Sequence, residues 1–200
     1  MNIKTLVLGP LQVNCYIIYV NQKCVVIDPG AEPEKVMNTC EDLGLEIEAI
    51  LLTHGHFDHV GGVKKLVEET NCALWMHQGD WSQKPGPMTS YLYPLANCDF
   101  TEVQFCEHGQ VINAAGLSFS VLETPGHTWG SVCYRCGDAL FTGDTLFAGG
   151  CGRTDLPGGD WKTIHESLKR LVAMEGDCAV YPGHGEATTL AIERENNPYI

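Results

Sequence analysis

Four polar residues follow an apolar run at 49–53, and their types and spacing suit a metal site. They form a His-x-His-x-Asp-His pattern made of His54, His56, Asp58 and His59. Imidazole and carboxylate together suit zinc, and less exclusively iron or manganese. In an extended chain His54 and His56 point to the same side, so both can bind one cation. Asp58 and His59 are adjacent and cannot both point that way, which predicts a turn and a second cation. The alternative is a surface loop that is merely rich in histidine.

Three later residues follow apolar runs in the same manner, each behind a glycine. They are His127, Asp144 and His184. Each alone would be an ordinary turn residue, but strand ends followed by loops are where functional groups are usually presented. Together with the first cluster they supply enough ligands for two cations. The assignment is His54, His56 and His127 for the first cation, Asp58, His59 and His184 for the second, and Asp144 as a bridge between them.

Two divalent cations that share one water would lower its pKa to near neutral, so hydroxide would exist at pH 7. This predicts a hydrolase in which one cation polarises a carbonyl group and the other stabilises the leaving group. The shared hydroxide would attack the carbonyl carbon. Asp58 would lie close enough to orient that hydroxide, which makes it the candidate catalytic residue.

The elements that must position these residues are short strands and amphipathic helices. The segment 77–108 lacks periodicity and is expected to be an irregular loop, either a lid or pocket wall or an ordinary surface excursion. Asp160 is expected to cap the third helix, and His165 within it to be structural or solvated. Strands are predicted at 2–7, 13–19, 24–28, 47–53, 73–76, 110–112, 117–122, 131–135, 139–141 and 179–181, and helices at 33–43, 60–69, 161–174 and 187–195.

The bulk composition narrows the possible partners. Two hundred residues that are 44% hydrophobic can bury a proper core, as one large domain or two small ones. The net charge of -13 repels phosphate backbones and anionic lipid, so neither nucleic acid nor membrane is an expected partner. The N-terminus lacks the pattern of a signal peptide, and the 10 cysteines form no paired framework, so a cytoplasmic location with reduced thiols is expected. Cys133 and Cys136 form a lone Cys-x-x-Cys, without the second pair of a zinc ribbon.

The ordered motifs resemble those of the metallo-β-lactamase superfamily. The resemblance implies a four-layer αββα sandwich of the α/β (α+β) class, as a single catalytic domain over 1–200 with the metals at one edge of the sheets. It also implies that Asp28 supports the ligands from behind. The motifs are Asn14-Cys-Tyr, Ile27-Asp-Pro-Gly30, Thr53-His-Gly-His-Phe-Asp-His59, Thr124-Pro-Gly-His127, Thr142-Gly-Asp144 and Pro182-Gly-His184.

Two further stretches are similar to the short, bacterial type of glyoxalase II-like proteins. They are Gly150-Cys-Gly-Arg-Thr-Asp155 with the following Leu156-Pro-Gly-Gly-Asp160, and the tail from Pro182 to Thr189 with Asn197-Pro198. The implied substrate is a small hydroxyacyl thioester such as S-lactoylglutathione, and the implied cofactors are two divalent ions, zinc foremost with iron or manganese as alternatives.

The resemblance leaves open the thiol carrier of the substrate and several competing functions. Longer glyoxalase II enzymes carry a C-terminal helical domain that helps hold glutathione, and none is expected here, so the carrier stays open. Arg153 is a candidate for binding an anionic substrate group, or it pairs with Asp155 as scaffold. The main rival is a persulfide dioxygenase with one iron, which the stretch 151–155 also resembles. Other rivals are a lactonase, a phosphodiesterase or a metal-binding scaffold without catalysis.

Overall fold

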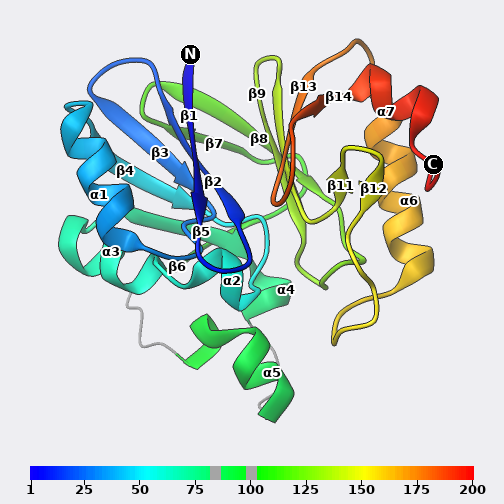
Figure 1. The fold of residues 1–200 in the computed structure, drawn as a ribbon, viewed down its shortest axis with the longest axis horizontal. Helices are drawn as coiled ribbons and strands as arrows, with labels where there is room; N and C mark the ends of the chain where they lie inside the picture. The colour runs from blue at the N-terminus through cyan, green and yellow to red at the C-terminus, as the bar shows by residue number, and fades with distance from the viewer. Residues whose placement is uncertain (82–86, 98–102) are drawn as a thin grey trace.

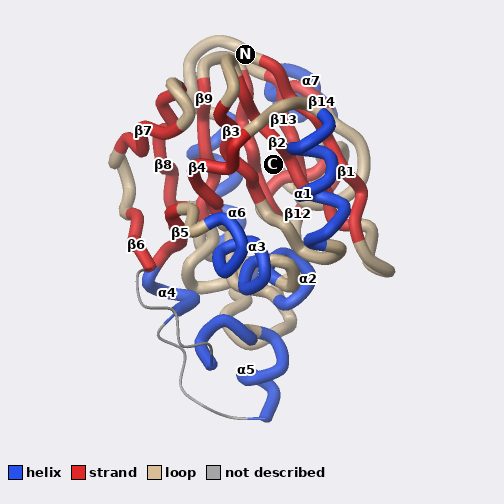
Figure 2. The backbone as a smooth tube through the Cα atoms, turned by 90° about the vertical axis from the view of Figure 1, so that its left-hand side faces the viewer, coloured by secondary structure: helices blue, strands red, loops and turns tan. Residues whose placement is uncertain are grey.

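Two mixed sheets pack face to face and helices cover their outer faces, which confirms the expected αββα sandwich (Figures 1 and 2). The computed structural model describes residues 1–81, 87–97 and 103–200. In the described part, the first sheet has the order β1 (Asn2–Leu8), β2 (Val13–Tyr19), β3 (Lys23–Ile27), β4 (Glu46–Leu51), β5 (Ala73–His77), β6 (Val103–Cys106). The second has the order β14 (Thr188–Thr189), β13 (Ala179–Pro182), β10 (Ala139–Gly143), β9 (Val132–Cys136), β8 (Leu117–Glu123), β7 (Val111–Ala114).

Continuous apolar strands result from burial on both faces of each sheet. In β3, Val25 points into the core between the two sheets, where it joins Phe119 and Phe141 of the second sheet. Its neighbour Val26 points to the other face and packs in the core shared with α1 (Pro33–Asp42) and α3 (Val63–Thr70). Successive residues of a strand face opposite sides, so a strand covered on both faces needs apolar residues at every position.

The second sheet is covered in the same way by α6 (Trp161–Val172) and α7 (Leu190–Asn196). Leu168 and Leu190 from these helices pack with Leu140 of β10. Asp160 caps α6 as predicted, because its side chain accepts a hydrogen bond from the backbone N–H of Thr163 at 2.7 Å. Four layers therefore enclose one core between the sheets and one under each helical layer.

The helix predicted at 60–69 was wrong at its start. α3 begins at Val63, and a separate short helix α2 (Phe57–Val60) carries Asp58 and His59. Gly61 and Gly62 separate the two helices because they lie against the loop at residues 29–30. A Cβ atom at Gly61 would lie 2.3 Å from the Gly30 carbonyl oxygen, and one at Gly62 2.7 Å from that of Pro29.

The irregular loop predicted at 77–108 was also partly wrong. Its described residues form α4 (Gln78–Trp81), α5 (Pro87–Leu92), the 3-10 helix η1 (Pro94–Asn97) and the edge strand β6. These elements are too short to give a clear periodicity, and β6 exposes two of its four residues. The parts of the predicted loop at 82–86 and 98–102 lie outside the described residues.

Smaller differences concern the chain's second half. The last helix begins at Leu190 rather than 187, because Thr188–Thr189 forms β14 and the Thr189 side chain caps the helix. A short hairpin of β11 (Leu146–Phe147) and β12 (Gly150–Cys151) lies between β10 and α6, where the sequence predicts no strand. Cys133 and Cys136 fall in different cores, so they form no pair. None of the described helices is long and apolar enough to cross a membrane.

Candidate metal centre

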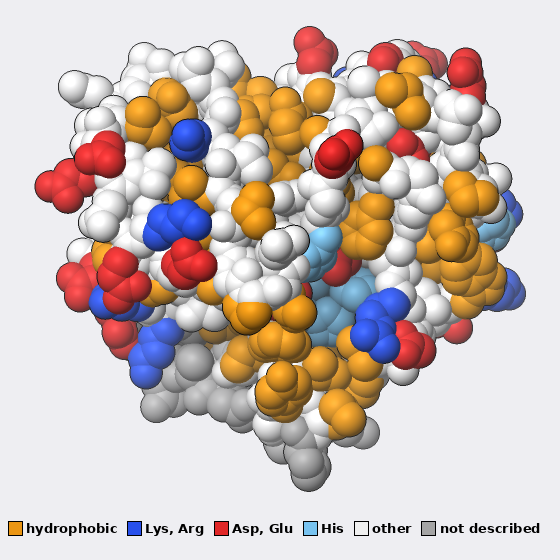
Figure 3. Space-filling model, viewed as in Figure 1, with side chains coloured by type: hydrophobic (Ala, Val, Ile, Leu, Met, Phe, Trp, Pro, Cys, Tyr) orange, Lys and Arg blue, Asp and Glu red, His pale blue; other side chains and the backbone are white. Residues whose placement is uncertain are grey.

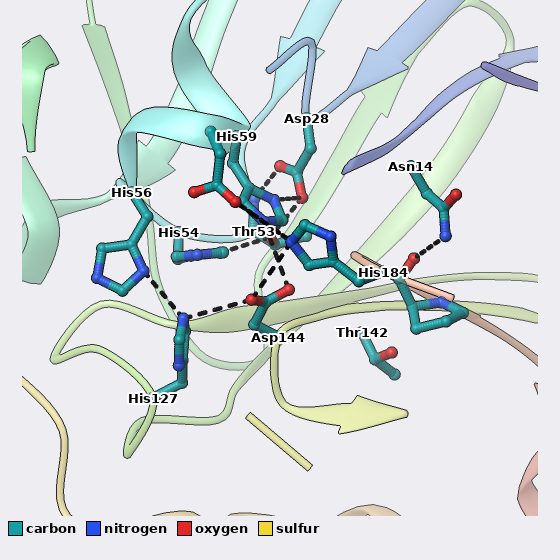
Figure 4. A network of polar contacts seen from close by, with 12 residues as sticks. Asn14, Asp28, Thr53, His54, His56, His59, His127, Thr142, Asp144 and His184 are labelled. Carbon is teal, nitrogen blue, oxygen red and sulfur yellow. Dashed lines mark hydrogen bonds and ion pairs between the residues drawn. The ribbon is translucent and has the colours of Figure 1, made fainter. Parts of the chain in front are cut away.

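The seven predicted ligand residues all come from chain segments that leave strand ends, and these segments meet at one edge of the two sheets (Figure 4). His54 and His56 lie in the turn after β4, and α2 follows directly. His127 lies in the loop between β8 and β9. Asp144 follows β10, and His184 follows β13. Figure 4 shows these histidines and Asp144 pointing toward a common centre.

Three groups of described side chains are close enough to hold a metal ion, and the first consists of His54, His56 and His127. One ligand atom from each lies within 4.8 Å of the others, and all three side chains are buried. His56 Nδ1 and His127 Nε2 are 2.9 Å apart. This is the set predicted for the first cation. Another group, Asp28 with His54 and His59, is already joined by hydrogen bonds through Thr53 and the Nδ1 atoms of the two rings.

The second group consists of Asp58, His59 and His184, whose ligand atoms also lie within 4.8 Å of one another. His184 Nε2 is 3.2 Å from Asp58 Oδ2 and 3.3 Å from His59 Nε2. The adjacent Asp58 and His59 both face this group because the first turn of α2 rotates the chain between them. This is the set predicted for the second cation.

Asp144 lies between the two groups. Its Oδ2 is 3.5 Å from Nε2 of His127 in the first group, and its Oδ1 is 3.4 Å from Nε2 of His59 in the second. Oδ2 is also 3.7 Å from His184 Nε2. The carboxylate is therefore placed to contact cations in both groups, as a bridging ligand would.

Asp28 orients His59 directly and His54 through the Thr53 hydroxyl. It accepts hydrogen bonds from the Thr53 backbone N–H (2.8 Å) and hydroxyl (2.6 Å), and from His59 Nδ1 (2.9 Å). Because His59 donates through Nδ1, its neutral ring presents a lone pair at Nε2. The Thr53 hydroxyl, which donates to Asp28, accepts from His54 Nδ1 at 3.1 Å, and this leaves the Nε2 lone pair of His54 facing inward as well. Such partners set ring orientation and tautomer in metal sites.

Sequence reasoning missed several supporting contacts because they involve backbone atoms. His127 Nδ1 donates to the carbonyl oxygen of Arg153 at 2.8 Å. Asn14 donates to the carbonyl oxygens of Pro182 (3.0 Å) and Gly185 (2.9 Å), on either side of His184. Any residue offers a carbonyl, so sequence carries no signal for these partners, although Asn14 stands in a recognisable motif.

The donor set fits divalent cations. His54 Nε2, His56 Nε2 and Asp144 Oδ1 are buried and have no hydrogen-bond partner among the described residues. A buried polar atom without a partner is destabilising, so His54 Nε2 and Asp144 Oδ1, which both face the centre, indicate a ligand that satisfies them. Imidazole nitrogens with carboxylate oxygens suit zinc, iron or manganese.

The protonation states differ between the two groups. Burial and the neighbouring histidines lower the pKa of His54 far below its ordinary value and that of His56 to about 3, so both stay neutral. Burial also lowers the pKa of His184, but the hydrogen bond to Asp58 and the charge of Asp144 outweigh it and raise that pKa overall. Burial opposes the charge of Asp58, yet His184 and His59 outweigh it and hold the pKa of Asp58 below its usual range.

The charged side chain of Arg153 is paired with Asp155. Its guanidinium forms two hydrogen bonds with Asp155, at 2.7 and 2.6 Å, and both side chains are exposed. The pairing with Asp155 is the scaffold alternative of the sequence analysis. The contact of Arg153 with the centre is made by its backbone.

Aromatic side chains border the centre. The rings of Tyr93 and His56 lie 5.1 Å apart, those of Tyr93 and Trp129 6.1 Å, and those of Phe57 and Tyr91 5.0 Å. The Tyr93 hydroxyl donates to the Pro157 carbonyl at 2.8 Å. Figure 3 shows histidines at the bottom of a hollow that apolar side chains border. The described part of the segment 77–108 thus includes a wall of the pocket.

Comparisons with known proteins agree with this fold and site. The sequence model of the Metallo-beta-lactamase superfamily matches residues 8–184. Hydroxyacylglutathione hydrolase GloC of Haemophilus influenzae is 34% identical over 208 residues, which covers 100% of this chain and 98% of that protein. The crystal structure of BLEG-1 B3 metallo-beta-lactamase is similar at a TM-score of 0.86, with 32% identity over 99% of both chains. TTHA1623 in a di-iron-bound form has a TM-score of 0.85 and 39% identity, covering 98% of this chain and 100% of that one.

The αββα sandwich, with histidines and aspartates gathered at one edge, has the fold and the site of a metallo-hydrolase. The chain belongs to the metallo-β-lactamase superfamily. Its similarity to GloC is consistent with the glyoxalase II-like character expected from the motifs.

Proposed function

We propose that this protein is a metal-dependent hydrolase of hydroxyacyl thioesters such as S-lactoylglutathione. The observation that carries the proposal is the position of Asp144 between two complete ligand groups, His54–His56–His127 and Asp58–His59–His184. Two cations suit the hydrolysis of an acyl bond, because one side of the centre can face the carbonyl oxygen and the other the leaving group. The similarity to hydroxyacylglutathione hydrolase GloC supports the choice of a thioester.

The residues of each group would hold one cation, and Asp144 would contact both. When bound, two such cations supply Lewis acidity that polarises a carbonyl group and lowers the pKa of water. Zinc is the first candidate, with iron and manganese as alternatives, because imidazole and carboxylate accept all three. The di-iron form of TTHA1623 supports keeping iron in view.

Asp58 is the group of this chain best placed to handle a proton. Its Oδ2 lies 3.2 Å from His184 Nε2, and its low pKa keeps it ionised at neutral pH. An ionised carboxylate beside the reacting centre can accept a hydrogen bond from the attacking water and orient it. His59 and His127 are held from behind by Asp28 and by the Arg153 carbonyl, so the ligand rings need little reorganisation.

The surroundings favour a small-molecule substrate. Phe57, Tyr93 and Trp129 supply an apolar border that can contact an acyl chain or a thioester sulfur. The net charge of -13 disfavours nucleic acid as a partner. The pair Arg153–Asp155 is electrically balanced, so it offers an anionic carrier little net attraction.

The decisive experiment measures metal content and activity on one preparation. Purified protein is expected to contain about two metals per chain and to hydrolyse S-lactoylglutathione, which a chelator should abolish and added metal restore. A panel of other thioesters, lactones and phosphodiesters, together with oxygen uptake on glutathione persulfide, tests the rival activities. One iron per chain with oxygen uptake and no thioester hydrolysis would overturn the proposal.

A further inference from the structure

A buried carboxylate outside the ligand set connects the loops of the first group. Asp80 lies in α4 and is 1% exposed. Its Oδ2 accepts hydrogen bonds from the Gly55 backbone N–H at 2.8 Å and from the Thr128 hydroxyl at 2.7 Å. Its Oδ1 accepts one from the Gly130 backbone N–H at 2.7 Å. All three donors point at one carboxylate, so the side chain is satisfied within the protein.

Two of the three donors are neighbours of metal-ligand candidates in the sequence. Gly55 separates His54 from His56, and Thr128 directly follows His127. Asp80 therefore joins the two segments that supply the first group, the turn after β4 and the loop between β8 and β9. Among the described residues, each of its three hydrogen bonds goes to one of these two segments and none goes to Asp58, His59 or His184.

Two glycines, Gly55 and Gly130, let the backbone pass close to Asp80. A Cβ atom at Gly130 would lie 2.6 Å from the Asp80 backbone nitrogen and 2.8 Å from its Cγ. A Cβ atom at Gly55 would lie 3.0 Å from the Asp80 Cβ. Glycine at both positions lets the two loops approach this carboxylate closely. The hydroxyl oxygens of Ser131 and Thr128 lie 2.7 Å apart. Because the Thr128 hydroxyl donates its hydrogen to Asp80, Ser131 is the donor in this second bond and Thr128 the acceptor.

The first group needs such a connection. His56 Nδ1 and His127 Nε2 lie 2.9 Å apart, on different loops. When both nitrogens present lone pairs to one cation, the lone pairs repel each other at that distance. A buried tie between the loops keeps the rings together before the cation arrives, which reduces the reorganisation that binding requires.

We propose that Asp80 is a positioning residue that presets the geometry of His54, His56 and His127 for one cation, without acting on the second group. The proposal rests on the two-metal centre of the proposed function. Partners behind metal ligands typically change metal affinity by about 10- to 100-fold when they are removed. The effect of Asp80 should therefore appear in the affinity of one group only.

The test places Asp80→Asn in two backgrounds and measures zinc affinity by titration of metal-free protein against a competing chelator. His184→Ala disables the second group, and His127→Ala disables the first. An asparagine offers one acceptor oxygen and turns an N–H group toward one of the three donors. We expect zinc affinity to fall about tenfold or more in the His184→Ala background and less than about twofold in the His127→Ala background.

Glu193 provides a matched control. It is 2% exposed and also accepts three hydrogen bonds, from the Gly149 N–H, the Thr188 hydroxyl and the Asn197 side-chain amide. Glu193→Gln makes the same chemical change in an equally buried carboxylate that contacts neither ligand group. We expect it to alter stability without changing zinc affinity in either background.

The results separate this inference from the proposed function. An equal loss of affinity in both backgrounds, no loss in either, or the same pattern for Glu193→Gln would overturn the role of Asp80 while leaving the metal centre intact. A parent protein that binds no zinc, iron or manganese would overturn both proposals. If Asp80→Asn does not fold, Thr128→Val removes the hydroxyl that donates to Asp80 and accepts from Ser131, and it should give a smaller loss of zinc affinity with the same selectivity. Thr128→Ser keeps the hydroxyl and should restore the affinity. Absence of that selectivity would equally overturn the inference.

Discussion

The imidazole Nδ1 of His127 donates a hydrogen bond to the backbone carbonyl oxygen of Arg153 at 2.8 Å. The guanidinium of the same arginine turns away to Asp155. One residue thus supports a ligand histidine through its main chain while its charged side chain is occupied elsewhere. This separates two roles that a sequence motif cannot distinguish, positioning of a ligand and recognition of an anionic substrate.

Replacing the Arg153 side chain should consequently have little effect. Arg153→Ala keeps the carbonyl that His127 uses, and it removes an exposed ion pair of the kind that contributes little to stability or binding. Metal content should be unchanged, and KM for S-lactoylglutathione should change less than about threefold. Asp155→Ala is the matched variant, and it should likewise leave the metal content unchanged, because it removes only the other partner of this exposed pair. A tenfold rise in KM for Arg153→Ala alone would instead assign the guanidinium to the substrate.

Removing His184 should convert a two-metal centre into a one-metal centre. His184→Ala deletes one ligand of the second group and leaves the first group intact. Bound metal should fall from about two to about one per chain, and kcat for thioester hydrolysis by at least about a hundredfold. Metal analysis and steady-state kinetics on the same sample measure both.

His165→Ala is the control for that experiment. His165 lies on α6, and its Nδ1 contacts the Tyr199 carbonyl oxygen at 3.0 Å, outside both ligand groups. Its metal content and kcat should equal those of the parent. Full activity of His184→Ala with one metal would contradict the two-metal hydrolysis and favour a mononuclear reaction.

Asp28→Asn should weaken the centre without changing a ligand. Asp28 has a φ of 50°, a left-handed conformation that asparagine tolerates well, so the backbone can keep its shape. Its carboxylate accepts from Thr53 twice and from His59. The amide would leave one buried donor unsatisfied, which should lower the free energy of unfolding by about 1–3 kcal/mol. Metal affinity should fall about tenfold or more, because His59 loses part of its support.

Chemical denaturation of the metal-free protein and zinc titration test the two halves of this prediction. Asp42→Asn, at the exposed end of α1, makes the same change away from the centre and should alter neither quantity. Unchanged metal affinity for Asp28→Asn would mean that His59 is oriented by packing alone.

The convergence of the seven side chains could be predicted because their signal is local. Each follows an apolar strand closely, and the strand ends of a sandwich meet at one edge. The adjacency of Asp58 and His59 correctly required a turn, although the helix predicted to start at residue 60 turned out to begin at Val63. The topology came from the resemblance of the ordered motifs rather than from periodicity.

The supporting contacts could not be predicted because they join distant residues. Asp80 contacts Gly55 across 25 positions, Thr128 across 48 and Gly130 across 50. Asp80 sits in a four-residue helix inside a segment without periodicity, where an aspartate would ordinarily be read as a polar surface residue. Only the fold reveals that it is buried and surrounded by donors.

The two ligand groups should lose their metals at different pH values. Metal binding requires neutral imidazole, so protons compete with the cation. In the metal-free protein, burial opposes the charged form of His59 and His184, but the neighbouring carboxylates outweigh it and raise the pKa of both. His56, with a pKa of about 3, stays neutral. As the pH falls, protons therefore displace the metal from the second group first, and the first group keeps its metal to a lower pH.

Equilibrium dialysis at a fixed zinc concentration, from about pH 8 to about pH 3, with zinc counted per chain, measures this order. The expected curve falls in two steps, from about two to about one and then toward zero. The sign follows from the raised pKa values, since a group that binds protons more tightly gives up its metal at higher pH. His184→Ala should lack the step at higher pH, and His127→Ala the step at lower pH. If His127→Ala instead removed the step at higher pH, the first group would be the more acid-sensitive one, and the assignment of proton affinities to the two groups would be wrong.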